Sequence, residues 1–159
     1  MMDTDNMPLT TAYIAPSTEA ALEALPFELP LPENLPFDGS PFEVVDLLDM
    51  NEKDGKEIRV KLKSVLNDDP LEGWISVEAE DATGSRLPTG IATPVKFSDQ
   101  RTGHFQTNQS LESSMLQWTE NDIWYTITYL NKQETYDVQK HKEILVDLAE
   151  QIMDQFNKQ

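Results

Sequence analysis

The sequence predicts a single α+β domain: a curved antiparallel β-sheet with an amphipathic C-terminal helix on one face, preceded by an arm and a short N-terminal helix. Apolar and polar residues alternate in several short runs in the middle of the chain, which is the period of a half-buried strand. Near the C-terminus the apolar residues recur every three or four positions, as in an amphipathic helix. A hairpin rich in aromatic residues, at positions 116–129, lies between the two patterns. Strands followed by one such helix indicate a sheet with a helix across one face.

The composition excludes several classes of function. A chain of 159 residues fits one domain, and its net charge of -17 comes from 29 acidic and 12 basic residues. Such a charge opposes nucleic-acid binding, which depends on neutralising phosphates with Lys and Arg, and it also opposes binding to anionic membranes. There is no cysteine, so disulfides and thiolate chemistry are excluded. No apolar run reaches the roughly 18 residues of a membrane span, so we expect no transmembrane segment.

The N-terminal part of the chain is read as an arm, a helix and an extended segment. Residues 1–16 are small or polar without a period, and we expect a disordered or loosely held arm, with the single domain covering residues 17–159. Residues 17–25 predict a short helix with Ser17 as its N-cap. The four prolines of residues 26–37 exclude a helix or a central strand. The apolar residues between these prolines predict that the segment lies along the body of the domain.

The strands are predicted from alternation and from turn residues between them. The candidates are residues 41–48, 56–63, 73–80, 93–97 and 102–107, followed by the two arms of the hairpin at 116–129. In the second candidate Ile58, Val60 and Leu62 alternate with charged residues and should face inward. Pro94 predicts that the fourth candidate is an edge strand or a segment that leads into the sheet.

The last element is a helix over residues 137–156. Leu145, Leu148 and Ile152 form its apolar stripe, while acidic residues occupy the opposite side. His141 is expected at the solvated start of this helix.

The aromatic hairpin supports two interpretations. In the first, its rings belong to the core. In the second, alternation places Tyr125, Ile127 and Tyr129 against the helix and leaves Trp118 and Trp124 on the other face, where they are candidate ligand-binding residues.

No pattern in the sequence predicts a catalytic or metal site, and we expect no cofactor. The two histidines, His104 and His141, fall on different elements without an H-E-x-x-H pattern. No serine lies in a G-x-S-x-G elbow. The acidic loop that precedes the second strand candidate has Val60 where a calcium loop requires its bidentate Glu. The sequence therefore favours a protein that is not an enzyme.

Three blocks of the sequence resemble the Gram-positive domain-of-unknown-function family 4367, and they occur in that family's order. Residues 26–36 are similar to its proline-rich opening, residues 116–127 to its W-x-E-x-(D/G)-x-x-Y-x-(L/I) block, and residues 142–152 to its closing helix. Gln151 stands where the family's closing helix has Ser, and the loop 131–139 is long. The family occurs in secreted lipoproteins and in the extracytoplasmic parts of anti-sigma-factor-like membrane proteins. The resemblance implies a non-enzymatic extracytoplasmic domain and supplies no catalytic residues.

These observations together predict a non-catalytic binding or sensory module outside the cytoplasm, secreted or membrane-anchored, with its export signal removed. Its partner would be a small apolar ligand or a protein. The alternative is a cytoplasmic interaction protein whose acidic surface binds a basic protein partner. An enzyme that uses surface carboxylates is the third interpretation.

Overall fold

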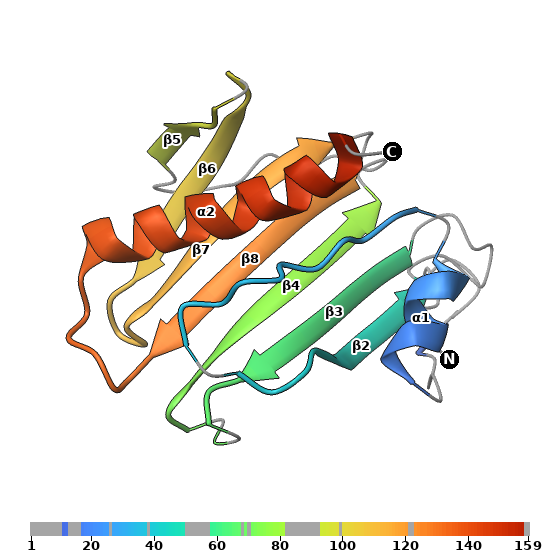
Figure 1. Ribbon diagram of the computed structural model, residues 1–159, viewed down its shortest axis with the longest axis horizontal. Helices are drawn as coiled ribbons and strands as arrows, with labels where there is room; N and C mark the ends of the chain where they lie inside the picture. Colours follow the sequence, from blue (N-terminus) through green and yellow to red (C-terminus); the bar gives the residue numbers. More distant parts are fainter. Residues whose placement is uncertain are drawn as a thin grey trace, which may run out of the picture.

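The computed structural model describes residues 11–12, 17–25, 27–37, 39–49, 58–67, 69, 71–81, 93–98, 100–120 and 123–157. It confirms the predicted α+β class, with an open antiparallel sheet, a C-terminal helix packed on it and a short N-terminal helix (Figure 1). The elements, in chain order, are β1 (Thr11–Ala12), α1 (Thr18–Ala24), β2 (Glu43–Asp49), β3 (Ile58–Val65), β4 (Gly73–Asp81), β5 (Thr93–Lys96), β6 (Thr102–Asn108), β7 (Ser113–Glu120), β8 (Ile123–Asn131) and α2 (Val138–Asn157).

The sheet is built from two antiparallel meanders that meet in its middle. Its strand order is β1-β2-β3-β4-β8-β7-β6-β5. After β4 the chain crosses to the far edge at β5 and returns strand by strand, so that β8 pairs with β4 along its whole length, from Gly73↔Asn131 to Asp81↔Ile123. The predicted hairpin of the second and third strands is present as β2 and β3, and the aromatic hairpin is present as β7 and β8.

Helix α2 covers the half of the sheet formed by β7 and β8. The carboxylate of Asp137 accepts a hydrogen bond from the Lys140 N–H, which caps the first turn. Leu145, Leu148 and Ile152 are fully buried, as their spacing predicts. We call the face that α2 covers the helix face and the opposite one the outer face.

The proline-rich segment 27–37, which we call the strap, crosses the helix face beside α2 (Figure 1). Leu29 is buried, and the other apolar residues of the strap pack against the core, as predicted. The hydroxyl of Tyr125 donates to the Glu28 carbonyl at 2.9 Å, and Gln155 Nε2 donates to the Leu31 carbonyl at 2.8 Å. Because prolines leave few backbone donors, side chains of the domain hold the strap in place.

Gln151 makes the densest set of these contacts. Its Oε1 accepts from the backbone N–H groups of Glu33 and Asn34, each at 3.0 Å, and its Nε2 donates to the Asn34 carbonyl at 2.9 Å. One amide side chain therefore replaces the strand partner that this part of the strap lacks.

Gln151→Ala should loosen the strap without unfolding the domain. Each lost hydrogen bond contributes about 0.5–1.5 kcal/mol, and we expect a total loss of about 1–2 kcal/mol and faster amide exchange at Glu33 and Asn34. Thermal melting and hydrogen exchange measure both effects. Gln139→Ala is the matched control, because Gln139 is exposed on the same helix and its side-chain amide donates to Glu143. Equal effects of the two variants would contradict this role of Gln151.

The N-terminal elements cover the rest of the helix face. Helix α1 lies by β2, and the Ser17 hydroxyl caps it by accepting from the Ala20 N–H at 3.0 Å, as predicted. Of the predicted arm the structure describes only Thr11 and Ala12, which pair with Asp49 and Leu48 at the edge of the sheet. Residues 1–10, 13–16, 50–57 and 82–92 lie outside the described residues. They include the turn 51–55 that the sequence predicts between the first two strands, and most of the polar connection 81–90.

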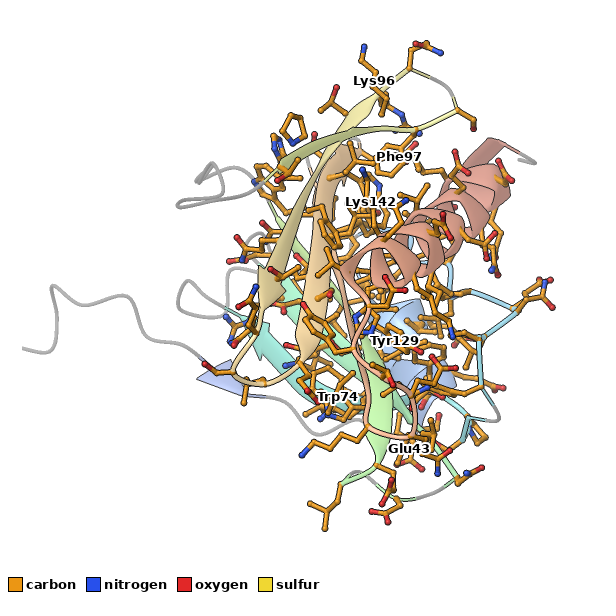
Figure 2. The ribbon with its side chains drawn as sticks, turned by 90° about the vertical axis from the view of Figure 1, so that its left-hand side faces the viewer. Glu43, Trp74, Lys96, Phe97, Tyr129 and Lys142 are labelled. Atoms are coloured by element: carbon orange, nitrogen blue, oxygen red, sulfur yellow. The ribbon has the colours of Figure 1, made fainter. Side chains whose placement is uncertain are left out.

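The core lies between the sheet and these covering elements. Strand β3 alternates between buried and half-buried residues, with Val60 and Leu62 inward as predicted. At the other end, Gly103 leaves room for the Phe97 ring, because a Cβ on this glycine would lie 2.6 Å from Phe97 Cζ. Figure 2 views the sheet from the side: α2 lies on the helix face, and register places Trp74 and Tyr129 on opposite faces of the sheet.

Candidate functional site

The outer face holds a hollow of about 530 Å3 over β6, β7 and β8. Register places five of its lining residues on that face: Gln106, Asn108, Ser113, Met115 and Thr128. Thr107, Gln109 and Ser114 also line the hollow. The volume lies within the range of small-molecule sites, about 300–1,000 Å3. The side chains of this lining end mostly in amides and hydroxyls, whereas the sequence predicts a small apolar ligand or a protein partner.

Cross-strand register sets the polar pattern of the hollow. Gln106 pairs with Met115, and Met115 pairs with Thr128, so the three side chains form one row across β6, β7 and β8. In the next row Gln117 faces Thr126, and its Nε2 donates to the Thr126 hydroxyl at 3.1 Å. In the first row Met115 lies between the two polar side chains, Gln106 and Thr128. In the second row Gln117 and Thr126 are neighbours and are hydrogen-bonded to each other.

Trp124 lies on the outer face, as the alternation of β8 predicts, and it is half-buried. Its indole N–H is buried and has no hydrogen-bond partner among the described residues. Trp124 is directly opposite Thr119 on β7.

The predicted position of Trp118 is wrong. Trp118 pairs with Tyr125 and therefore lies on the helix face, where only 1% of it is exposed. It stacks on the Tyr125 ring at 5.4 Å and meets Phe97 edge-on at 6.0 Å. The pairing Glu120↔Ile123 across the turn sets this register, so Trp118 and Trp124 fall on opposite faces and Trp118 is a core residue.

The outer face becomes charged towards β3. Arg59, Lys61 and Lys63 point outward there, opposite carboxylates such as Glu78, which lies 3.8 Å from the Arg59 side chain. The Lys63 ammonium sits over the Trp74 ring at 4.6 Å from its centroid. Partial burial, followed by the neighbouring charge of Lys61, lowers the pKa of Lys63. The neutral hollow and the charged strand thus occupy different parts of one face.

A second polar cluster is buried on the helix face, directly behind the hollow. Ser114 Oγ lies 2.8 Å from His141 Nδ1, and these residues are 1% and 2% exposed. The imidazole packs against the rings of Tyr129, at 4.6 Å, and Tyr136, at 4.9 Å. The expectation that His141 lies at a solvated helix start is therefore wrong, because the first turn of α2 already packs on β7 and β8.

The pair cannot act as an exposed nucleophile and base in this conformation, although its geometry has the form of a Ser–His dyad. Burial lowers the pKa of His141, while the charges of Glu134 and Asp137 raise it and that of Lys140 lowers it. Burial also raises the pKa of the neighbouring Tyr129 hydroxyl, which accepts a hydrogen bond from Asn131 Nδ2. The cluster is a closed, largely neutral network that fastens α2 to the sheet.

In the part of the chain that the structure describes, no three His, Asp or Glu side chains come together in a way that could hold a metal ion.

None of the described helices is long and apolar enough to cross a membrane.

Sequence reasoning missed the residues of the hollow and of the buried cluster for different reasons. His141 continues the spacing of Leu145, Leu148 and Ile152 back by one turn, and this signal could have located it. For Gln106, Met115 and Thr128, alternation could indicate the face of the sheet, but their assembly depends on pairing between separate strands.

Comparison with protein-family models, curated proteins and solved structures gives no match to this chain. The family resemblance of the three sequence blocks stays a prediction.

Proposed function

We propose that this protein is a non-catalytic binding module that acts outside the cytoplasm and holds its ligand on the outer face of the sheet. The observation that carries the proposal is the hollow over β6, β7 and β8, where half-buried polar side chains surround Met115. On the helix face α2, the strap and α1 pack on the sheet and bury its apolar residues.

The location outside the cytoplasm is supported by the resemblance of residues 26–36, 116–127 and 142–152 to an extracytoplasmic family. In a Gram-positive bacterium the abundant ligand-bearing material outside the membrane is the cell wall. We therefore expect the protein to bind purified Gram-positive cell walls from which the anionic teichoic acids have been removed, because the net charge of -17 opposes binding to those polymers.

Thr128→Arg should disrupt this binding. Thr128 is half-buried on the outer face and lines the hollow, so a long charged side chain there would occupy the binding surface. We expect at least about a tenfold loss of affinity, which corresponds to roughly 1.4 kcal/mol. Co-sedimentation of the protein with the walls, over a range of protein concentrations, measures the effect.

Thr135→Arg is the matched control, since Thr135 is an exposed threonine in the loop that leads to α2. It adds the same charge and should leave wall binding unchanged. Failure of the wild-type protein to sediment with the walls, or equal losses in the two variants, would overturn the proposed function.

A further inference from the structure

The described residues that line the hollow are all uncharged, although the chain carries 29 acidic and 12 basic residues. The side chains of the lining end in amides, hydroxyls and one thioether. An ionic ligand would find no countercharge in this lining and would lose hydration on entering it. The hollow therefore favours an uncharged ligand.

The row Gln106–Met115–Thr128 has an apolar centre and polar ends. Neighbouring strands are about 4.8 Å apart, so the two polar residues lie roughly 10 Å from each other with Met115 between them. Both are half-buried, and neither side chain has a hydrogen bond within the described residues. In contrast, the amide of Gln117 in the adjacent row is bonded to Thr126. The hydrogen-bonding groups of Gln106 and Thr128 are thus available to a ligand at the two sides of an apolar floor.

We propose that this hollow binds a neutral sugar ring, with the ring over Met115 and its hydroxyl groups held by Gln106 and Thr128. This inference rests on the proposed function and names the ligand class of the same site. A pyranose ring has an apolar C–H face and a rim of hydroxyl groups that both donate and accept. A Gln amide and a Thr hydroxyl each donate and accept as well, so they match that rim. An extended neutral peptide offers hydrogen bonds along its edges but no apolar disc to cover Met115.

The outer face gives room for more than one sugar. Trp124 lies four residues from Thr128 on the same face of β8, about 13 Å along the strand, and is half-buried. An oligosaccharide that starts in the hollow runs towards this indole, whose ring face suits stacking on a second sugar.

Titration of the isotope-labelled protein with neutral trisaccharides tests the proposal. The probes are cellotriose, maltotriose and chitotriose, each followed by amide and side-chain chemical shifts. We expect at least one to shift the signals of Gln106, Met115 and Thr128 in a saturable way. Gln106→Ala should weaken that binding about three- to tenfold, as expected for one lost hydrogen bond. Met115→Glu, which puts a charge in the floor, should remove it.

Gln117→Ala is the matched control, because this glutamine lies on the same face but is already bonded to Thr126. It should bind the trisaccharide as the wild-type protein does. Absence of saturable shifts with all three sugars, equal weakening by Gln106→Ala and Gln117→Ala, or shifts at the hollow with a neutral extended peptide and not with sugars would overturn the proposal. If Thr128→Arg abolishes wall binding while the sugar titrations fail in one of these ways, the proposed function is supported and the sugar proposal is overturned, so the two failures are distinguishable.

Discussion

Leu148→Asp is expected to remove the cooperative unfolding transition of this protein. Leu148 is 1% exposed and lies on the face of α2 that packs against β7 and β8. Loss of a buried Leu side chain alone costs about 2–5 kcal/mol, and an unpaired carboxylate in its place adds the cost of desolvating a charge. Since domains are stable by only about 5–15 kcal/mol, the substitution consumes most or all of the stability.

Circular dichroism and differential scanning calorimetry measure this effect, and Leu148→Ala supplies a graded version. For a domain of this size about 3 kcal/mol should lower Tm by roughly 6–12 °C. Val138→Asp is the control, because Val138 is on the same helix but 42% exposed, and it should melt within a few degrees of the wild type. A Tm for Leu148→Asp close to that of Val138→Asp would show that α2 does not pack through this side chain.

The stability of the protein is expected to fall as the pH decreases below about 6.5, because His141 is buried in its neutral form. Burial lowers the pKa of His141 from its ordinary value of 6.5, and the opposing charges of Glu134 and Asp137 do not reverse that direction. Between the lowered folded-state pKa and 6.5 the unfolded chain binds a proton that the folded chain does not. The free energy of unfolding therefore decreases as the pH falls through this window, by at most about 1.4 kcal/mol per pH unit. Above pH 6.5 the contribution is fully present.

The groups around the imidazole explain why protonation is unfavourable. Ser114 from β7, Tyr129 from β8 and Tyr136 from the connecting loop contact the ring, and none of them is a carboxylate. Lys140, which is paired with Glu134 at 2.8 Å, adds a positive charge nearby. A second proton on the ring would therefore be buried without an ion-pair partner in contact.

Urea unfolding at a series of pH values measures this dependence. His141→Asn keeps a polar group near the position of Nδ1 but cannot titrate, so its stability should vary less with pH than that of the wild type between pH 6.5 and about 5, where carboxylates begin to titrate. His104→Asn serves as the control, because His104 lies on the outer face away from this cluster. Parallel curves for the wild type and His141→Asn would contradict the role of His141.

Much of the fold could be predicted because apolar residues recur with a regular spacing within its strands and its C-terminal helix. The alternation of Ile58, Val60 and Leu62 gave the inner face of β3, and the spacing of Leu145, Leu148 and Ile152 gave the buried stripe of α2. The strap could be recognised because apolar residues between prolines favour an extended segment with a buried side. The position of Trp118 could not be predicted in this way. The face on which it lies depends on the pairing register of β7 and β8 across their turn, and a shift of that register by one residue moves every side chain of a strand to the opposite face.

The kinds of element, most of their positions and the class of fold follow from local sequence, because hydrophobic periodicity and capping act over a few neighbouring residues. The position of β8 between β4 and β7 depends on long-range strand pairing, and this pairing brings Gln106, Met115 and Thr128 into one row. Tertiary packing also buries Trp118 in the core and His141 against Ser114. These arrangements join residues far apart in the chain. They depend on which strands hydrogen-bond to each other and on how α2 and the strap fill the helix face, and a local pattern contains neither piece of information.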